Sequence, residues 1–160
     1  MKYDSHSVGE TGKIAQEILG NLDSRNVILL QGELGAGKTT FCQNVLGLLG
    51  ATGPFTSPTF VIMKRYEVGK LKIQNLPAGR QGSKFHFIYH FDCYRVGSRD
   101  ILELGWEEIV GNPKNLVLVE WPEKIKDILP RDSVKILFEV KGENERGIQV
   151  DFAEKKESKK

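Results

Sequence analysis

Residues Gly32-Glu33-Leu34-Gly35-Ala36-Gly37-Lys38-Thr39 decide the fold, because they match the pattern G-x-x-x-x-G-K-[ST] of a phosphate-binding loop at every fixed position. The apolar residues 27–30 precede this loop and predict a buried strand, and residues 40–49 follow it and predict a helix. The glycines allow a tight turn whose backbone N–H groups, together with the helix N-terminus, bind an anion. Strand, loop and helix therefore agree on a phosphate site.

The same stretch predicts how a nucleoside triphosphate binds. The ammonium group of Lys38 is expected to reach the β- and γ-phosphates, and the hydroxyl group of Thr39 is expected to bind Mg²⁺. The residues expected to contact the nucleotide from the loop and the start of the helix are Gly35, Ala36, Gly37, Lys38, Thr39 and Thr40.

The rest of the chain alternates between helical and strand patterns. Ser7 and Glu10 predict a helix start, and this helix is expected to end near Gly20. Further strands are predicted at 59–66, 85–92, 116–119, 134–140 and 148–152, and helices at 101–110, with a break at Gly105, and at 122–129. The first two of these strands are expected to pair as an antiparallel hairpin. With no repeat and no linker, residues 1–160 are interpreted as a single domain.

Two segments are interpreted as lying outside this framework. Residues 69–84 are too many and too rich in glycine for a tight turn, which predicts a mobile insertion between the hairpin strands. Residues 154–160 form a charged run, which is typical of a frayed end rather than of a binding arm.

Composition limits the class of protein and its compartment. The net charge of +2 over 160 residues is too small to indicate nucleic-acid binding by itself. Two cysteines, Cys42 and Cys93, do not make a disulfide framework, and they favour a reducing compartment. The N-terminus lacks the apolar stretch of a secretory signal, and no apolar run is long enough to span a membrane. A cytoplasmic protein is therefore expected, and no zinc site is expected where Cys93 follows His90 and Asp92.

Two acidic residues stand at the ends of predicted strands. Glu120 follows the apolar strand 116–119, and in proteins with a phosphate-binding loop such a carboxylate holds Mg²⁺ or orients the attacking water. Asp92 ends the strand 85–92 on the face opposite its aromatic residues, where it can serve as a general base or support the magnesium ligands. For a lone strand-end acid, exposure to solvent is the alternative interpretation.

Other polar residues allow more than one interpretation. Arg95 can stabilise charge on the γ-phosphate or form an ordinary surface ion pair. His86 and His90 share a strand face, which favours a structural role. Ser57-Pro58-Thr59 follows the helix behind the loop, where many nucleotide hydrolases place a segment that senses the γ-phosphate.

Together these residues resemble the TsaE (YjeE-like) family, the bacterial ATPases of tRNA threonylcarbamoyladenosine biosynthesis. The resemblance runs from about Thr11 to Pro130. Its motifs, in the family's order and spacing, are Gly32-Glu33-Leu34-Gly35-Ala36-Gly37-Lys38-Thr39-Thr40-Phe41, Ser57-Pro58-Thr59-Phe60, His90-Phe91-Asp92-Cys93-Tyr94-Arg95, Glu103-Leu104-Gly105 and Leu118-Val119-Glu120-Trp121-Pro122-Glu123. The joint occurrence of the third and fifth motifs is highly specific.

The resemblance implies an α/β fold with a phosphate-binding loop, in which a mostly parallel sheet with an antiparallel hairpin is flanked by helices. It implies Mg²⁺-dependent ATP hydrolysis that supports threonylcarbamoylation of the tRNA adenosine beside the anticodon. In that family the hydrolase acts on a complex of two partner proteins, TsaD and TsaB, in which TsaD is the transferase, so that tRNA is involved only indirectly.

The resemblance also implies roles for particular residues. Lys38 binds phosphates, Thr39 and Glu120 contact Mg²⁺, Asp92 supports hydrolysis, and Thr11 lies near the adenine. Trp121 either shapes the site or a partner surface, or packs as an ordinary aromatic residue at the end of a strand.

The sequence departs from the family pattern at two places. Cys93 replaces an aliphatic residue, and the segment 69–84 is longer than the family's hairpin connection, which leaves any partner contact there in doubt. Two other classes stay open. A small-molecule kinase shares the loop and the length, although no Arg-rich lid is visible, and a GTP-dependent switch is disfavoured because the chain has no Asn-Lys-x-Asp motif.

Overall fold

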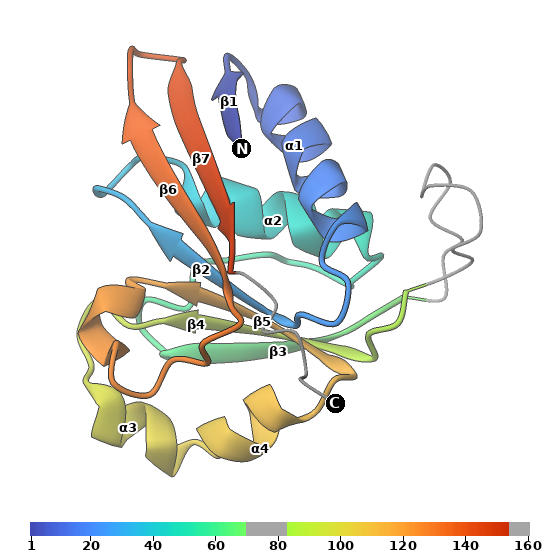
Figure 1. The fold of residues 1–160 in the computed structure, drawn as a ribbon, viewed down its shortest axis with the longest axis vertical. Coiled ribbons are helices and arrows are strands. Elements are labelled where there is room, and N and C mark those ends of the chain that lie inside the picture. The colour runs from blue at the N-terminus through green and yellow to red at the C-terminus, as the bar shows by residue number, and fades with distance from the viewer. Residues whose placement is uncertain (70–82, 154–160) are drawn as a thin grey trace, which may run out of the picture.

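The structure, a computed structural model, describes residues 1–69 and 83–153. Within these ranges, seven strands form one mixed sheet in the order β1-β7-β6-β2-β5-β4-β3, with helices on both faces (Figure 1). The elements in chain order are β1 Lys2–Ser5, α1 Val8–Gly20, β2 Val27–Gln31, α2 Lys38–Leu48, β3 Met63–Glu67, β4 Phe87–Asp92, α3 Ser98–Glu103, α4 Trp106–Gly111, β5 Asn115–Glu120, the 3₁₀ helix η1 Pro122–Ile125, β6 Val134–Val140 and β7 Arg146–Phe152.

The sheet has a parallel centre and antiparallel edges. Strands β6, β2, β5 and β4 are parallel neighbours. At one edge β3 pairs antiparallel with β4, and at the other edge β7 and β1 continue the sheet antiparallel to β6. The α/β fold and the antiparallel hairpin of strands β3 and β4 are therefore confirmed.

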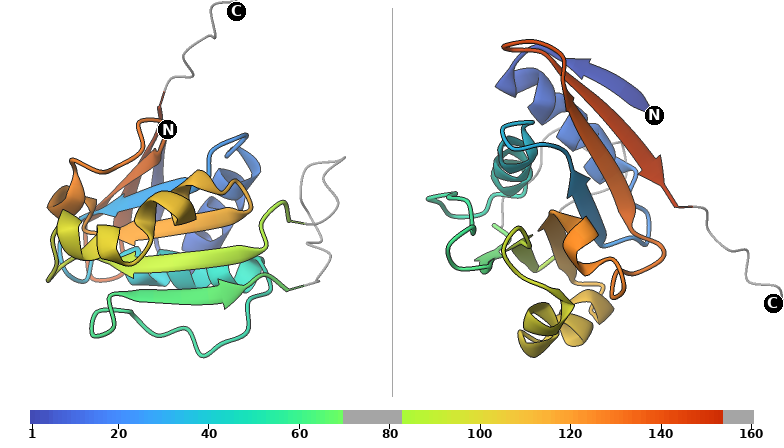
Figure 2. Two further views of the ribbon diagram at one scale, coloured as in Figure 1. Left: turned by 90° about the horizontal axis from the view of Figure 1, so that it is seen from below. Right: turned by 90° about the vertical axis from the view of Figure 1, so that its left-hand side faces the viewer.

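Both faces of the central strands are buried, which explains why their sequences are continuously apolar. Ile28 and Leu30 of β2 face the core under α1 and α2, whereas Val27 and Leu29 face the core under α3, α4 and η1. Figure 2 shows these two helical layers from two further directions. The break predicted at Gly105 separates α3 from α4, and Gly105 has a φ angle of +84°.

Several element boundaries differ from the sequence prediction, and at three of them local hydrogen bonds explain the difference. The N–H groups of Val61 and Ile62 donate to the carbonyl oxygen of Pro58, which forms a turn, so β3 starts at Met63 instead of residue 59. Strand β4 starts at residue 87 instead of 85, because the N–H group of His86 donates to a loop carbonyl oxygen. The helix predicted at 122–129 is limited to η1, where bonds between residues three apart replace the α-helical pattern.

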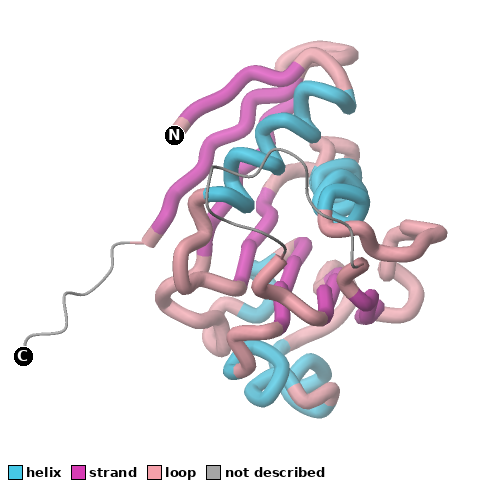
Figure 3. The backbone as a smooth tube through the Cα atoms, turned by 90° about the vertical axis from the view of Figure 1, so that its right-hand side faces the viewer, coloured by secondary structure: helices cyan, strands magenta, loops and turns pink. Residues whose placement is uncertain are grey.

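The N-terminal strand β1 was not predicted. It pairs with β7, so the start of the chain lies beside the C-terminal hairpin (Figure 3). The predicted helix start after it is confirmed, because the N–H group of Glu10 donates to Ser7 Oγ at 3.1 Å. Of the predicted mobile insertion 69–84, residues 70–82 lie outside the described residues, and the charged tail 154–160 also lies outside them.

The parallel register brings the carboxyl ends of β2, β5 and β4 to one edge of the sheet. Leu30 is the register partner of Glu120, and Glu120 is the register partner of Asp92. In open α/β sheets this edge is where ligands bind. Within residues 1–69 and 83–153, no helix combines the length and the apolar character needed to cross a membrane.

Candidate functional site

The loop between β2 and α2 has the conformation that its glycines predict. Gly32, Gly35 and Gly37 have φ angles of +147°, +78° and +106°, values that favour glycine. A Cβ atom at Gly32 would lie 2.7 Å from the carbonyl oxygen of Phe138, so the loop also passes β6 too closely for a side chain. No side chain caps the N-terminus of α2, which leaves its first N–H groups directed at the loop and suited to an anion.

The side chain of Lys38 folds over this loop. Its Nζ atom donates to the carbonyl oxygens of Gly32 at 2.6 Å and Glu33 at 2.9 Å, and it lies 4.1 Å from the ring centroid of Trp121. Burial lowers the pKa of Lys38, and the nearby carboxylate of Glu120 is the largest influence in the opposite direction. Two carbonyl oxygens therefore bind this ammonium group in the structure. Charged phosphate oxygens form stronger hydrogen bonds with an ammonium group than neutral carbonyl oxygens do.

The side chains of Thr39 and Glu120 meet at the start of α2. Thr39 Oγ1 lies 3.0 Å from Oε1 and 3.2 Å from Oε2 of Glu120, as its hydroxyl group donates to the carboxylate. The Oε1 atom also lies 2.8 Å from Nε2 of the buried His90. A hydroxyl group beside a carboxylate offers the oxygen ligands that Mg²⁺ prefers, so these two predicted magnesium ligands fit the ion.

A second carboxylate, that of Asp92, is held in place by two hydrogen bonds. Its Oδ2 atom accepts from Thr59 Oγ1 at 2.7 Å, and its Oδ1 atom accepts from the N–H group of Tyr94 at 3.0 Å. The hydroxyl group of Ser57 lies 2.6 Å from that of Thr59 and donates to it, because the proton of Thr59 is directed at the carboxylate. The segment expected to sense the γ-phosphate is thus connected to Asp92.

Aromatic residues surround the outer side of this region. The guanidinium group of Arg95 lies over the exposed ring of Phe60, 5.4 Å from its centroid. Trp121 contacts the ring of Tyr94 and has φ and ψ angles of +58° and +49°, which are unusual for a bulky residue. Such strained residues concentrate at functional sites, and the contact of Trp121 with Lys38 places it beside the predicted phosphate loop.

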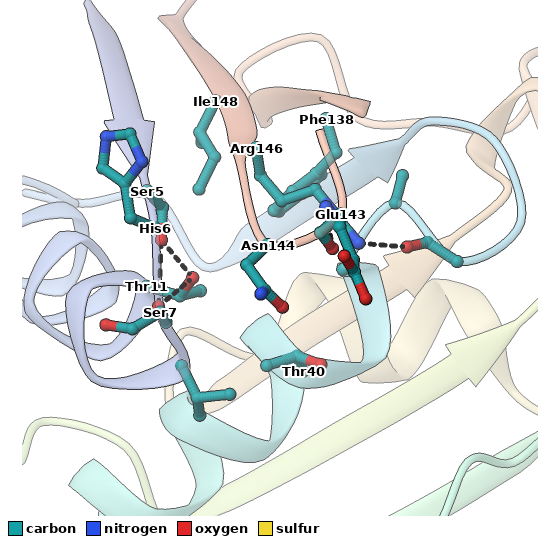
Figure 4. A pocket seen from close by; sticks show the side chains of 14 residues that line it. Ser5, His6, Ser7, Thr11, Thr40, Phe138, Glu143, Asn144, Arg146 and Ile148 are labelled. Atoms are coloured by element: carbon teal, nitrogen blue, oxygen red, sulfur yellow. Dashed lines mark hydrogen bonds between the residues drawn. The ribbon is translucent and has the colours of Figure 1, made fainter. Parts of the chain in front are cut away.

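Thr11 lines a cavity beside the loop. In Figure 4 the side chains of Thr11, Thr40, Asn144 and Arg146 surround this cavity. The loop residues that line it are Gly35, Ala36 and Gly37. Thr11 is therefore close to the predicted phosphate site, although its hydroxyl group is engaged by Ser5 Oγ at 2.8 Å.

Two residues of this region make contacts that the sequence did not predict, and one of them, His90, was expected to have only a structural role. His90 lies two residues before Asp92 on the same strand face, and this spacing was a signal that it belongs with the acidic residues. Arg146 joins the turn between β6 and β7 to the loop, as its Nη2 atom donates to the carbonyl oxygen of Gly35 at 3.3 Å. No local pattern in the sequence indicates the contact of Arg146 with Gly35.

Comparison with known proteins identifies the family of this chain. Residues 5–148 match the family described as threonylcarbamoyl adenosine biosynthesis protein TsaE. The chain belongs to the TsaE family. A TsaE relative from Rickettsia felis is 35% identical over 139 residues, which make up 86% of this chain and 71% of the relative. A Bacillus subtilis TsaE relative is 32% identical over 92% of this chain and 83% of its own length. Both relatives are named as tRNA threonylcarbamoyladenosine biosynthesis proteins.

The fold of this TsaE family member is similar to a solved structure as well. The crystal structure of Bacillus subtilis YdiB aligns with a TM-score of 0.69 and 28% sequence identity. The alignment covers 96% of this chain and 86% of that protein. The α/β fold with its mixed sheet is therefore shared with an experimentally determined structure.

Proposed function

We propose that this TsaE protein hydrolyses ATP in a Mg²⁺-dependent reaction, and that hydrolysis supports threonylcarbamoylation of the tRNA adenosine beside the anticodon. The observation that carries the proposal is the bond between Thr39 and Glu120, formed directly beside Lys38 at a complete phosphate loop. Membership of the TsaE family supports the link to tRNA modification. The buried, free thiols of Cys42 and Cys93 agree with a cytoplasmic location.

The residues divide the work between binding and chemistry. The N–H groups at the start of α2 and the ammonium group of Lys38 bind the phosphates, while the cavity at Thr11 receives the nucleoside. Thr39 and Glu120 are the residues that would hold Mg²⁺. When bound, this ion neutralises charge on the phosphates.

Asp92 supports the chemical step in this proposal. Its carboxylate is buried and is held from both oxygen atoms, so its orientation is set before a nucleotide arrives. A carboxylate held in this way can orient a water molecule and accept its proton. Since Ser57 and Thr59 lie on an irregular segment outside the sheet, a partner protein that contacts this segment can change the position of Asp92.

Hydrolysis is expected to be slow for the isolated chain and faster with a complex of the partner proteins TsaD and TsaB. The physical reason is that docking orders the segment beside Asp92 and excludes water, which strengthens electrostatic stabilisation of the transition state. The measurement is steady-state phosphate release from ATP, with and without the complex, in Mg²⁺ and in EDTA. High turnover by the chain alone that the complex leaves unchanged would contradict partner activation, and a phosphorylated metabolite in place of free phosphate would favour a kinase.

Thr59→Val is expected to slow hydrolysis about tenfold, since a hydrogen bond to a charged group contributes about 1.5 kcal/mol. ATP affinity is expected to change little, because Thr59 contacts Asp92 and not the phosphate loop. Single-turnover rates and calorimetric affinities measure the two effects separately. Thr52→Val, at an exposed position of the same loop, is the matched control. A loss of affinity as large as the loss of rate would show that Thr59 does not act through Asp92.

A further inference from the structure

Three side chains of different chemistry meet in the interior behind the phosphate loop. Cys42 comes from α2, His90 from β4 and Glu120 from β5, and all three are buried, with exposures of 0%, 1% and 3%. One ligand atom from each, the thiol sulfur, a ring nitrogen and a carboxylate oxygen, lies within 4.8 Å of the other two. Sulfur, imidazole nitrogen and carboxylate oxygen are the ligand types of protein zinc sites.

We propose that Cys42, His90 and Glu120 form a binding site for a divalent transition-metal ion of the zinc class, and that this ion inhibits hydrolysis by occupying Glu120. The inhibition rests on the proposed function, in which Glu120 is a ligand of Mg²⁺. The binding itself does not depend on that function.

Charge and ligand chemistry favour this class of ion over Mg²⁺. A thiolate is a soft ligand that suits zinc-class ions, whereas Mg²⁺ prefers oxygen ligands alone. Burial raises the pKa of the Cys42 thiol well above its usual value, so the free protein holds the proton. Binding forms a metal–sulfur bond and releases this proton to water. The resulting thiolate and the carboxylate of Glu120 together balance the two positive charges of the ion.

The geometry needs only a small adjustment. Tetrahedral ligands at zinc bond lengths lie about 3.5 Å apart, so the three atoms must move by about 1 Å or less. His90 can make this movement because its ring is held by one hydrogen bond, to Glu120, and its Nδ1 atom has no hydrogen-bond partner among the described residues. Thr39, which is half-buried and contacts Glu120, connects the cluster to the proposed nucleotide site.

The second cysteine provides an internal control. Cys93 is also buried, but it packs with Phe91, Trp106 and Val119 in the hydrophobic cluster on the opposite face of the sheet. In sequence it is Cys93 that follows His90 closely, yet Cys93 comes just after β4 ends at Asp92 and packs on the opposite face of the sheet from Cys42. The structure brings Cys42 to His90 instead.

The test is a titration of the full-length protein with Co²⁺, followed by the absorption band that a thiolate–cobalt bond produces. Wild type and Cys93→Ala are expected to show the band, and Zn²⁺ is expected to displace Co²⁺ and remove it. Cys42→Ala is expected to lack the band and to bind Co²⁺ at least about tenfold more weakly, since even indirect partners of a ligand contribute this much. His90→Gln is a second variant that weakens binding, and circular dichroism verifies that each variant is folded.

The inhibition has a separate readout. Each protein's rate of phosphate release in excess Mg²⁺ is compared with its own rate after Zn²⁺ is added, and EDTA followed by fresh Mg²⁺ is expected to restore the rate. Wild type and Cys93→Ala are expected to be inhibited, and Cys42→Ala is expected to resist. Absence of the cobalt band in wild type, or an equal band in folded Cys42→Ala, would overturn the metal site. A cobalt band without any ATPase activity would instead refute the proposed function and leave the metal site standing.

Discussion

Glu120→Gln is expected to lower the rate of ATP hydrolysis by roughly 10²- to 10⁴-fold, the range seen when a positioned acid–base or charge-stabilising group is removed. The variant should fold, because the Gln amide has nearly the same shape and its oxygen atom can still accept the bond from Thr39. It lacks the negative charge that would hold Mg²⁺, so the chemical step should suffer far more than nucleotide binding. The measurements are the steady-state rate of phosphate release and the calorimetric affinity for ATP.

Two comparisons make this result specific. Glu108→Gln is the matched control, since Glu108 is an exposed residue of α4 on the other side of the sheet. Asp92→Asn removes the second buried carboxylate and should also reduce turnover more than affinity. Turnover at the wild-type level in either acidic variant would remove that residue from the proposed catalytic groups.

Lys38→Ala is expected to weaken ATP binding about ten- to a hundredfold, because a hydrogen bond to a charged group contributes roughly 1.5–3 kcal/mol. In the structure the ammonium group lies at the phosphate loop and bonds to the backbone oxygens of Gly32 and Glu33. Calorimetric titration with ATP and Mg²⁺ measures the loss.

The control for this second variant is Lys126→Ala, which removes an exposed lysine that follows η1. Thermal unfolding of Lys38→Ala must also be followed, because the variant loses two hydrogen bonds to the loop as well as a charge. Unchanged ATP affinity in folded Lys38→Ala would refute the assignment of the phosphate loop.

Much of the fold was predictable because its signals are local. The glycines of 32–37 specify positive φ angles, and a continuous apolar strand before them specifies a position at the centre of a sheet. Ser7 and Gly105 mark a helix start and a helix break by the same local chemistry. Each of these signals is complete within a few residues, so one sequence is sufficient to recognise it.

The predicted secondary structure was wrong where strand pairing or local hydrogen bonds opposed the residue pattern. Strand β1 is a short edge strand of mostly polar residues, Lys2–Ser5, and it exists because β7 offers it backbone partners. Strand β3 starts at Met63 and not at residue 59, because two N–H groups that a strand would have used donate to the carbonyl oxygen of Pro58. Propensity is a weak guide at such positions, since the competing hydrogen bonds decide the conformation.

The sequence by itself determined the glycine loop with its positive φ angles, the strand and the helix on either side of it, and the presence of acidic residues at two strand ends. Only the tertiary structure decided which side chains meet. The contact of Thr39 with Glu120 joins residues 81 positions apart, that of His90 with Glu120 joins residues 30 apart, and that of Arg146 with Gly35 joins residues 111 apart. These contacts follow from the parallel register of β2, β5 and β4 and from the packing of α2 and the β6–β7 turn around these strands. Strand periodicity shows which face of a strand is buried, but it does not identify which distant strand lies beside it.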